Sequence, residues 1–489
     1  MWQPFSSRPR SAPKRPRTAS KASRPRLESL EDRVVLSALF DSVLDVGSDT
    51  ASVTAQSNAV DAAGNTYVVG SFSGPMDFDP NVVRPDGSDI LTPPGPWAGY
   101  IAKYAPDNTL VWARLVGSYS SRGPTSVAVD GAGNVHVSGE FSGQAAFGST
   151  SLTAAGPTDA YVTKLDANGN FLWTKSWGAS TTGEHDGDIA IDASGNVFTT
   201  GTSWYQNGNT YYYTGFEVRK YSPTGAVTWS KHFDNTGGSA NSLATDPGGN
   251  VYVAGNFSGI LDFNPDAKKT YYVTGGPNAN GYVLKLSASG SFGWVAPFIT
   301  RSTQVLSSVS PTDLALDAAG NIIVGGRYLG QVDFNPSTSV DTRLPNFATF
   351  TTDGFVARLS PTGSLQWATP LGCAPVESLA VDTTGAVYAT GSFYEPFVPG
   401  FGLPTVTSQG QTDVFVTKLT TTGAVDWAVT FGGTGTDDAN GIAVDAAGNI
   451  YLAGYYYSTT VDFDPDPLGT HTLTNPSGSN MFSLKLRQQ

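Results

Sequence analysis

The sequence predicts an all-β fold, a seven-bladed β-propeller made of four-stranded antiparallel blades. First, a stretch of the type Ala-Val-Asp-x-x-Gly-Asn-x-Tyr-Val-x-Gly occurs seven times in the 489 residues. Second, each copy is followed by another hairpin-like segment, so that one repeat holds four strands. Third, no segment between the copies has helical periodicity. One such unit cannot bury both of its faces, whereas seven units stacked around an axis can.

The first half of each repeat predicts a hairpin of strands that we call a and b. In the first copy, strand a ends at Asp61, whose carboxylate can accept hydrogen bonds from turn N–H groups. Gly64 supplies a positive φ, and Asn65 is a residue type that tolerates the left-handed region. Strand b then begins, rich in β-branched and aromatic residues. The sixth copy has Ala386 in place of the asparagine.

The second half of each repeat predicts strands c and d. Strand c carries a basic residue and strand d a tryptophan, which we expect to pack between blades. We expect the basic residues to pair with the turn aspartates of the same or a neighbouring blade. The basic positions are Lys103, Lys164, Lys220, Lys285, Arg358, Lys418 and Lys485, and the tryptophans are Trp112, Trp173, Trp229, Trp294, Trp367 and Trp427.

The seventh repeat has no strand d of its own. Its strand c, at 481–486, is followed by the last residue, Gln489. An apolar-rich segment at 39–46 precedes the first repeat, and Val43 lies as far before Asp61 as Trp112 lies before Asp130. We therefore expect this N-terminal strand to complete the last blade and close the ring, leaving no open sheet edge.

Residues 1–36 differ from the body of the chain at 37–489, which we assign to the propeller. They hold nine basic and three acidic residues with many Pro and Ser, which predicts a disordered tail. The chain has a formal net charge of −13, so its body is strongly acidic and we expect no nucleic-acid partner. No apolar run is long enough to span a membrane, and the single Cys373 excludes an intrachain disulfide.

The N-terminal segment and the repeats each resemble a known family. Residues 26–38, Arg-Leu-Glu-Ser-Leu-Glu-Asp-Arg-Val-Val-Leu-Ser-Ala, resemble the N-terminal motif of planctomycete surface and secreted proteins. This resemblance implies export, to the cell surface or the extracellular space. The repeats, with Gly-rich loops such as 431–438, resemble the bacterial SBBP β-propeller repeat over nearly all of 38–486. That resemblance implies the fold, and it implies no shared activity.

The connections predict which face of the ring binds. The a–b and c–d turns fall on one face and are nearly identical from copy to copy, which is typical of a scaffold. The b–c and d–a connections fall on the opposite face and vary, for example at 72–97, 202–214, 297–311 and 393–412. Variable loops on a rigid frame are the usual place for binding. Near the channel mouth on this face we expect the binding candidates Glu184, His185, Asp186, Asp188 and Asp313.

These mouth residues have two interpretations. A histidine with several carboxylates could bind metal or perform acid–base chemistry. The alternative is a solvated polar mouth with no chemistry. We assign no catalytic residue, and whether the chain is an enzyme stays open at this point, with a non-catalytic role favoured.

Four Asp-Phe-[Asp/Asn]-Pro segments are the candidates for metal binding. Their oxygen donors suit Ca²⁺, although no complete ligand loop follows them. The alternative is a polar strand end with Phe packed inward and Pro ending the strand. We expect no cofactor and at most weak Ca²⁺ binding. The candidate ligands are Asp77, Asp79, Asp262, Asn264, Asp266, Asp333, Asn335, Asp462, Asp464 and Asp466.

The sequence thus favours an exported or cell-surface, non-catalytic propeller that binds a protein or glycan through its loop face. One alternative is a propeller enzyme, a lyase or hydrolase, that acts on glycans through the channel mouth. Another is a purely structural surface module. We expect a monomer without a transmembrane segment.

Overall fold

The computed structural model describes residues 38–488, except residues 83, 119–122, 209, 235–236, 277, 302–305, 338, 348–351, 400–404, 467 and 476. The chain divides into two units, Met1–Leu36 and Ser37–Gln489. The predicted basic segment at 1–36 lies outside the described residues. All of the described strands belong to the second unit.

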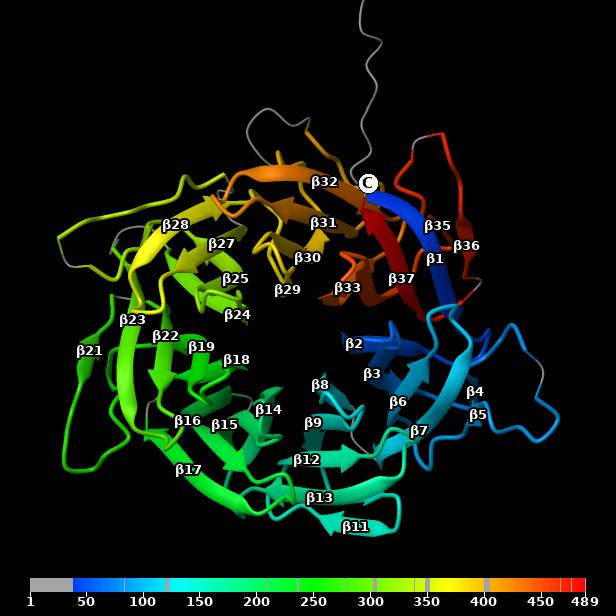
Figure 1. Cartoon of the computed structure of the whole chain (residues 1–489), viewed down its shortest axis with the longest axis horizontal. Coiled ribbons are helices and arrows are strands. Elements are labelled where there is room, and N and C mark those ends of the chain that lie inside the picture. Colours follow the sequence, from blue (N-terminus) through cyan, green and yellow to red (C-terminus); the bar gives the residue numbers. More distant parts are fainter. Residues whose placement is uncertain are drawn as a thin grey trace, which may run out of the picture. The chain divides into compact units, whose positions relative to one another are not determined.

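Seven antiparallel blades of four strands surround a central axis, as predicted (Figure 1), and the short β26 (Val332–Asp333) adds a fifth strand to the sheet of the fourth blade. The first three blades, from the axis outward, are β2 (Val53–Val60), β3 (Thr66–Phe72), β6 (Ala98–Tyr104) and β7 (Leu110–Ser118); β8 (Pro124–Val129), β9 (Val135–Phe141), β12 (Asp159–Leu165) and β13 (Phe171–Trp177); and β14 (Gly183–Ile191), β15 (Val197–Asn207), β16 (Thr210–Tyr221) and β17 (Val227–Asp234).

The next three blades repeat this order. They are β18 (Ser239–Thr245), β19 (Val251–Phe257), β22 (Asn280–Leu286) and β23 (Phe292–Thr300); β24 (Ser308–Leu316), β25 (Ile322–Leu329), β27 (Asp353–Leu359) and β28 (Leu365–Pro370); and β29 (Ser378–Val381), β30 (Val387–Phe393), β31 (Asp413–Leu419) and β32 (Val425–Phe431).

The seventh blade joins the two ends of the propeller. It consists of β33 (Asp437–Val444), β34 (Ile450–Tyr456), β37 (Asn480–Gln488) and, outermost, β1 (Ala38–Val46). The blue β1 lies beside the red β37 and pairs with it antiparallel from Ala38 opposite Gln488 to Val46 opposite Met481, with a bulge at Asp41 (Figure 1). The predicted closure of the ring by the N-terminal strand is confirmed.

The alignment of β1 with the other outer strands differs from the prediction by one residue. Trp112 lies opposite Lys103, and the residue opposite Lys485 is Ser42 rather than Val43. Counting back from Asp61 gave Val43 because the connection from strand d to strand a differs in length between these blades. The position of the missing tryptophan is therefore held by a small residue.

The a–b turns show the predicted role of aspartate and glycine. Asp61 Oδ1 accepts the N–H groups of Ala63 and Asn65 at 2.9 Å each, and Gly64 has a φ of 81°. The role expected for Asn65 is wrong, because Asn108 is the one non-glycine residue with a positive φ in the described part. Instead, Asn65 Nδ2 donates to Asp61 Oδ2 at 2.7 Å. The asparagine thus stabilises the turn through its side chain.

The strand d tryptophans connect neighbouring blades. Trp173 Nε1 donates to the carbonyl of Pro223, in the c–d turn of the next blade, at 3.1 Å. Gly225 in that turn has a φ of 82°, and a Cβ there would lie 2.7 Å from the indole. Four further pairs repeat this contact, with a Cβ 2.6 to 3.1 Å from the indole: Trp112 with Gly169, Trp229 with Gly290, Trp294 with Gly363 and Trp367 with Gly423.

The first blade shows why this glycine is needed elsewhere. Its c–d turn has Asn108, with a φ of 66°, at the glycine position. The preceding blade has Ser42 where others have tryptophan, so no indole lies over this turn. Glycine therefore occurs where a tryptophan stacks on the turn, and a side chain occurs where none does.

The basic residues of strand c have two structural roles. Lys164 Nζ lies 3.5 Å from Asp130, and Lys220 Nζ lies 3.7 Å from Asp192, in the turns of their own blades. Arg358 pairs with Asp317 in the same way. Lys103 and Lys285 lie over aromatic rings of strand b, 5.0 and 4.8 Å from the centroids of Tyr67 and Tyr252. Lys418 and Lys485 pair with Asp426 and Asp41, so the expected pairing with turn acids holds only for some blades.

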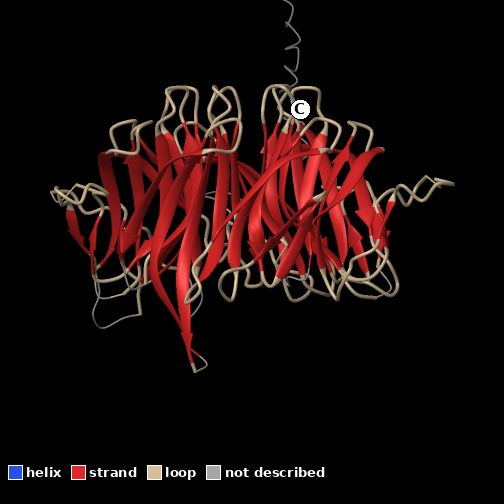
Figure 2. Cartoon of the chain, turned by 90° about the horizontal axis from the view of Figure 1, so that it is seen from below, coloured by secondary structure: helices blue, strands red, loops and turns tan. Residues whose placement is uncertain are grey.

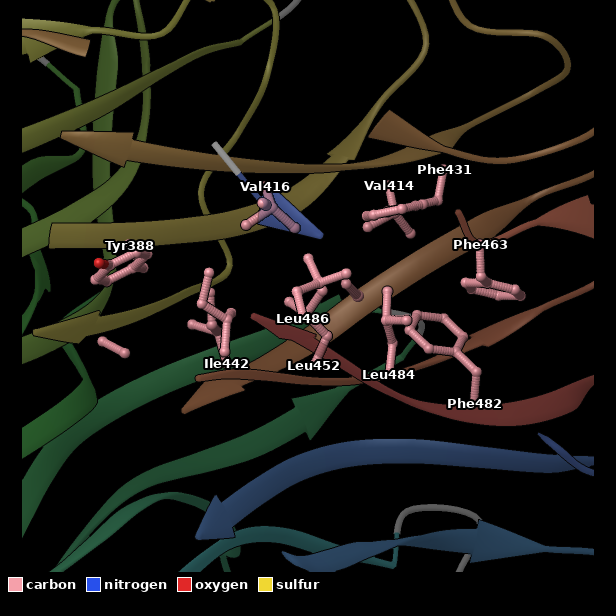
Figure 3. Close-up of a cluster of buried hydrophobic side chains, with 14 of the residues drawn as sticks. Tyr388, Val414, Val416, Phe431, Ile442, Leu452, Phe463, Phe482, Leu484 and Leu486 are labelled. Atoms are coloured by element: carbon pink, nitrogen blue, oxygen red, sulfur yellow. The ribbon is translucent and has the colours of Figure 1, made fainter. Parts of the chain in front are cut away.

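The core lies between blades. In Figure 3, side chains of β31 and β32 such as Val414 and Phe431 face Phe482 and Leu484 of β37 in the last blade. Phe463 packs among them, with its ring 5.0 Å from that of Phe482. His136, on strand b of the second blade, is fully buried in the core, and burial lowers its pKa to about 4.

Candidate functional site

The strands run between two faces of the ring (Figure 2). One face holds the a–b and c–d turns, which are alike in every blade. The other holds the b–c and d–a connections, which differ. We call these the turn face and the loop face. The bases of the loop-face connections surround the axis, where the candidate site lies.

Bulges in the innermost strands direct side chains toward the axis. Six of these strands shift register near their beginning, for example between Ala55 and Ser57 in β2 and between Pro311 and Asp313 in β24. A bulge turns a side chain that the strand would otherwise place elsewhere. Together with Glu377 before β29, the residues at these bulges line a narrow cavity of about 180 Å³ on the axis: Gln56, Thr125, Gly187, Asn241, Thr312 and Asn440.

Next to the bulges, serines and aspartates of five blades form a hydrogen-bonded belt. Asp188 accepts from Ser126 Oγ at 2.6 Å and from Ser242 Oγ at 2.9 Å. Ser242 Oγ also lies 2.9 Å from Asp313 Oδ1, and Ser378 Oγ donates to Asp313 Oδ2 at 3.1 Å. The belt links neighbouring blades through side chains, in addition to their apolar contacts.

Burial dominates the electrostatics of the belt. Burial, together with the nearby Asp188 carboxylate, raises the pKa of Asp313 to about 6. Hydrogen bonds from the N–H groups of Leu379 and Leu314, at 2.6 and 2.7 Å, act in the opposite direction. The pKa of Asp188 is raised for the same main reason.

A wider cavity of about 510 Å³ adjoins the axial one and shares Gly187, Asn241, Thr312 and Glu377 with it. We call the two together the funnel. Its further lining residues are His185, Asp186, Thr202, Tyr213, Ser239, Ala240, Asn256, Ser310 and Arg327. The funnel is thus lined mainly by hydroxyl, amide and ionisable groups.

Contacts inside the wide part orient its ionisable groups. His185 Nδ1 lies 2.7 Å from Glu140 Oε2, and its ring stacks on Trp204 with centroids 5.4 Å apart. Asp186 accepts from Thr125 Oγ1 at 2.7 Å, and burial raises its pKa well above the usual range.

The structure brings four of the five predicted mouth residues together. His185 and Asp186 line the wide part of the funnel, and Asp188 and Asp313 line the narrow part. Glu184 lies elsewhere. It accepts from Thr182 Oγ1 at 3.0 Å and lines a separate cavity of about 310 Å³ with Trp177.

Sequence reasoning missed several funnel residues. Nearly all of the bulge residues are polar, and each comes directly before the residue that begins the regular part of strand a: Ser57, Ser126, Asp188, Ser242, Asp313 and Gly441. Comparing the seven copies at that one position could have found Asn241 and Glu377. Glu140, from the end of β9, and Arg327, from β25, carried no signal, because only the closed ring places them beside this cavity.

The candidate metal ligands stabilise hairpins at the rim of the ring through hydrogen bonds. Asp262 Oδ1 accepts the N–H groups of Asn264 and Tyr271 at 3.0 and 2.7 Å, and Asp462 does the same with Asp464 and His471 at 3.1 and 2.8 Å. These contacts belong to the hairpins of β20 (Ile260–Asp262) with β21 (Tyr272–Thr274), and of β35 (Thr460–Asp462) with β36 (Thr472–Thr474).

The remaining candidates have similar structural contacts. Asp77 Oδ1 accepts the N–H of Asp79, whose own carboxylate pairs with Arg84 at 2.9 Å. In the same way, a side-chain oxygen accepts the N–H of the residue two positions later in six further pairs: Asp333 with Asn335, Asn264 with Asp266, Asp266 with Lys268, Asn335 with Ser337, Asp464 with Asp466, and Asp466 with Leu468. Asp333 also forms an ion pair with Arg301. The phenylalanines of all four segments are buried. Within the described ranges, no three His, Cys, Asp or Glu side chains are grouped to hold a metal. Weak Ca²⁺ binding stays a prediction.

The comparisons agree with a propeller of repeats. The SBBP β-propeller repeat model matches residues 426–463, which supports the resemblance seen in the sequence. A WD repeat-containing protein of Acanthamoeba polyphaga mimivirus, described as uncharacterized, is 24% identical over 469 residues, covering 78% of this chain. This chain spans about a third of that relative, 33% of its length.

Solved structures are similar at low identity. A Bacteroides caccae protein of unknown function is 13% identical, with a TM-score of 0.34, over 68% of this chain and 89% of that one. The periplasmic gluconolactonase of Pseudomonas aeruginosa is 13% identical, with a TM-score of 0.40, over 75% and 81% of the two chains. The described part of this chain contains no helix that could cross a membrane.

Proposed function

We propose that this chain is an exported or cell-surface binding protein that holds a protein or glycan ligand in the funnel on its loop face. One observation carries this proposal. All seven blades contribute to the lining of the axial cavity, six of them through a bulge that re-aims a side chain inward. Bulges are over-represented at sheet edges and next to active sites, where they re-aim a side chain.

The charges in the narrow part of the funnel support a binding role over catalysis there. Asp188 and Asp313 each accept hydrogen bonds from two serine hydroxyls and from backbone N–H groups. Carboxylates that are fully occupied in this way connect blades. They are poorly placed to transfer protons to a substrate, since a catalytic base needs a free lone pair within reach of it.

The test is a binding screen of the full chain against arrays of glycans and of bacterial surface proteins. A Thr312→Trp variant fills the shared wall of the two cavities, and Ala132→Trp adds the same bulk at an exposed turn on the turn face. We expect Thr312→Trp to abolish binding of any partner found and Ala132→Trp to leave it intact. Equal binding by both variants, with unchanged denaturation midpoints, would overturn the proposal.

A second candidate function is glycan cleavage in the wide part of the funnel. The contact of 2.7 Å between His185 and Glu140 favours it, because a carboxylate that orients a histidine is a common acid–base arrangement. Incubating each bound oligosaccharide with the parent protein and with His185→Gln, followed by mass analysis of the products, tests it. Shorter products formed by the parent alone would support this second function, and intact ligand with both would exclude it for that ligand.

A further inference from the structure

The hairpin of β15 and β16 extends the third blade beyond its neighbours. These are the longest strands in the described part, with 11 and 12 residues, and they remain paired out to Asn207 opposite Thr210. The pairing of β16 with the outermost strand, β17, ends at Gly215. The outer part of the hairpin therefore projects from the loop face without a third strand.

This projecting part carries four exposed tyrosines. The exposed fractions of Tyr205, Tyr211, Tyr212 and Tyr213 are 40, 55, 43 and 40%. The rings of Tyr205 and Tyr212 stack in parallel with centroids 5.2 Å apart, and Tyr211 lies edge-on to Trp204 at 5.0 Å. A large exposed aromatic surface is typical of an interaction site. Holding these rings on a paired hairpin also limits the entropy lost on binding.

The tyrosine hairpin is continuous with the funnel. Tyr213 is itself part of the wall of the wide cavity. Trp204, at the base of the same hairpin, stacks on His185, and the His185 ring lies 6.4 Å from that of Tyr213. Tyr211 lies on the same face of the hairpin as Trp204 and Tyr213, whereas Tyr205 and Tyr212 lie on the opposite face. A ligand seated in the funnel would therefore reach Tyr213 and Tyr211 without leaving the protein surface.

The funnel offers hydrogen bonds with little free negative charge. Asn241, Asn256 and Ser310 provide amide and hydroxyl groups on its wall. Burial raises the pKa of Asp186 and of Glu377, and the Glu377 carboxylate lies 3.9 Å from Arg327. In the narrow part, Asp188 and Asp313 accept hydrogen bonds from serine hydroxyls, and Glu140, beside the wide part, lies against His185. Such a wall suits many neutral hydroxyl groups better than it suits a cationic peptide.

We propose that the ligand of the funnel is a neutral oligosaccharide, one of whose sugar rings packs on Tyr211 and Tyr213 while its hydroxyl groups enter the funnel. This inference rests on the proposed function and narrows its ligand class. The negative face of an aromatic ring attracts the weakly positive C–H groups of a sugar face. The wide cavity of about 510 Å³ has the size of known small-ligand sites.

The experiment uses the full chain and immobilised neutral gluco-, manno-, xylo- and galacto-oligosaccharides, followed by titration of the best binder. The test variant is Tyr211→Ala with Tyr213→Ala. The control is Tyr272→Ala, because Tyr272 is 65% exposed and also lies on a hairpin, but on β21 at the rim. We expect the double variant to weaken binding at least tenfold and the control to change it less than twofold, with unchanged denaturation midpoints for both.

Two results would overturn the inference. The first is binding of a protein partner, blocked by Thr312→Trp, with no neutral oligosaccharide bound at millimolar concentration; this refutes the ligand class and leaves the proposed function standing. The second is an equal effect of the double variant and of Tyr272→Ala on oligosaccharide binding. Loss of the proposed function itself would show differently, as binding that Thr312→Trp does not affect.

Discussion

Replacing Gly225 with alanine tests the contact that joins neighbouring blades. Gly225 has a φ of 82°, and a Cβ there would lie 2.7, 3.0 and 3.1 Å from three indole carbons of Trp173. A left-handed conformation costs an L-residue about 1–2 kcal/mol. Overpacking against a ring held in place adds about 1–3 kcal/mol. We therefore expect Gly225→Ala to lower the free energy of unfolding by roughly 2–5 kcal/mol.

The control separates the two contributions. Gly208 has a φ of 62°, and a Cβ there would meet no atom within 4 Å, so Gly208→Ala should lose only the conformational part, about 1–2 kcal/mol. Urea denaturation of the full chain, followed by circular dichroism, measures both variants. Gly225→Ala is also made in a Trp173→Ala background, where its cost should fall to that of Gly208→Ala. An equal cost of Gly225→Ala with and without the indole would refute the stacking argument.

Four further predictions concern the ring and its carboxylates. Asn108→Gly should change the denaturation midpoint little, because no tryptophan covers that turn, whereas a loss as large as that of Gly225→Ala would contradict the explanation of Asn108. Deleting residues 1–36 should leave the melting temperature unchanged, and deleting 1–47 should lower it strongly, because β1 and the buried Leu44 and Val46 are lost; equal melting would refute closure by β1. Asp313 has a folded pKa of about 6 above an ordinary value of 3.8, so its stabilising effect is complete below pH 3.8 and is lost as pH rises toward 6. The stability advantage of the parent over Asp313→Asn, followed by thermal denaturation, should therefore be larger at pH 4 than at pH 7.5, by up to about 3 kcal/mol in the free energy of unfolding. A stability difference that does not change with pH would contradict the raised pKa of Asp313. Chelation of calcium should leave the melting temperature nearly unchanged. A large rise in the melting temperature with micromolar calcium, abolished by Asp262→Asn with Asp266→Asn, would show a tight calcium site.

The repeat made the fold predictable because each copy carries its own local signals. Asp61, Gly64 and the strand after them specify a hairpin through contacts within a few residues. Ring closure was predictable as well, since a missing last strand and an apolar first strand complement each other. The one-residue error at Val43 arose because the path from strand d to strand a is one residue longer between the last and first blades than between the first and second, which spacing alone does not reveal.

The site was less predictable than the fold. His185, Asp186, Asp188 and Asp313 were found because polar groups at the start of an innermost strand must lie near the axis. Glu184 was misplaced, since the side of a strand depends on where its bulge falls. Arg327 and Glu140 are brought to the funnel by the closed ring, over distances that no local pattern records. The tyrosines at 211–213 were visible in the sequence, but their position beside the funnel depends on the projecting hairpin and could not be predicted.

The central claim is that the ligand occupies the funnel on the loop face. Hydrogen–deuterium exchange of the full chain, with and without the best binder from the arrays, tests it most directly. We expect slower exchange in the outer part of the β15–β16 hairpin and around the bulges of β18 and β24, with no change in the turns at 166–170 and 222–226. Protection confined to those turns, or to the rim hairpin of β20 and β21, would contradict the claim.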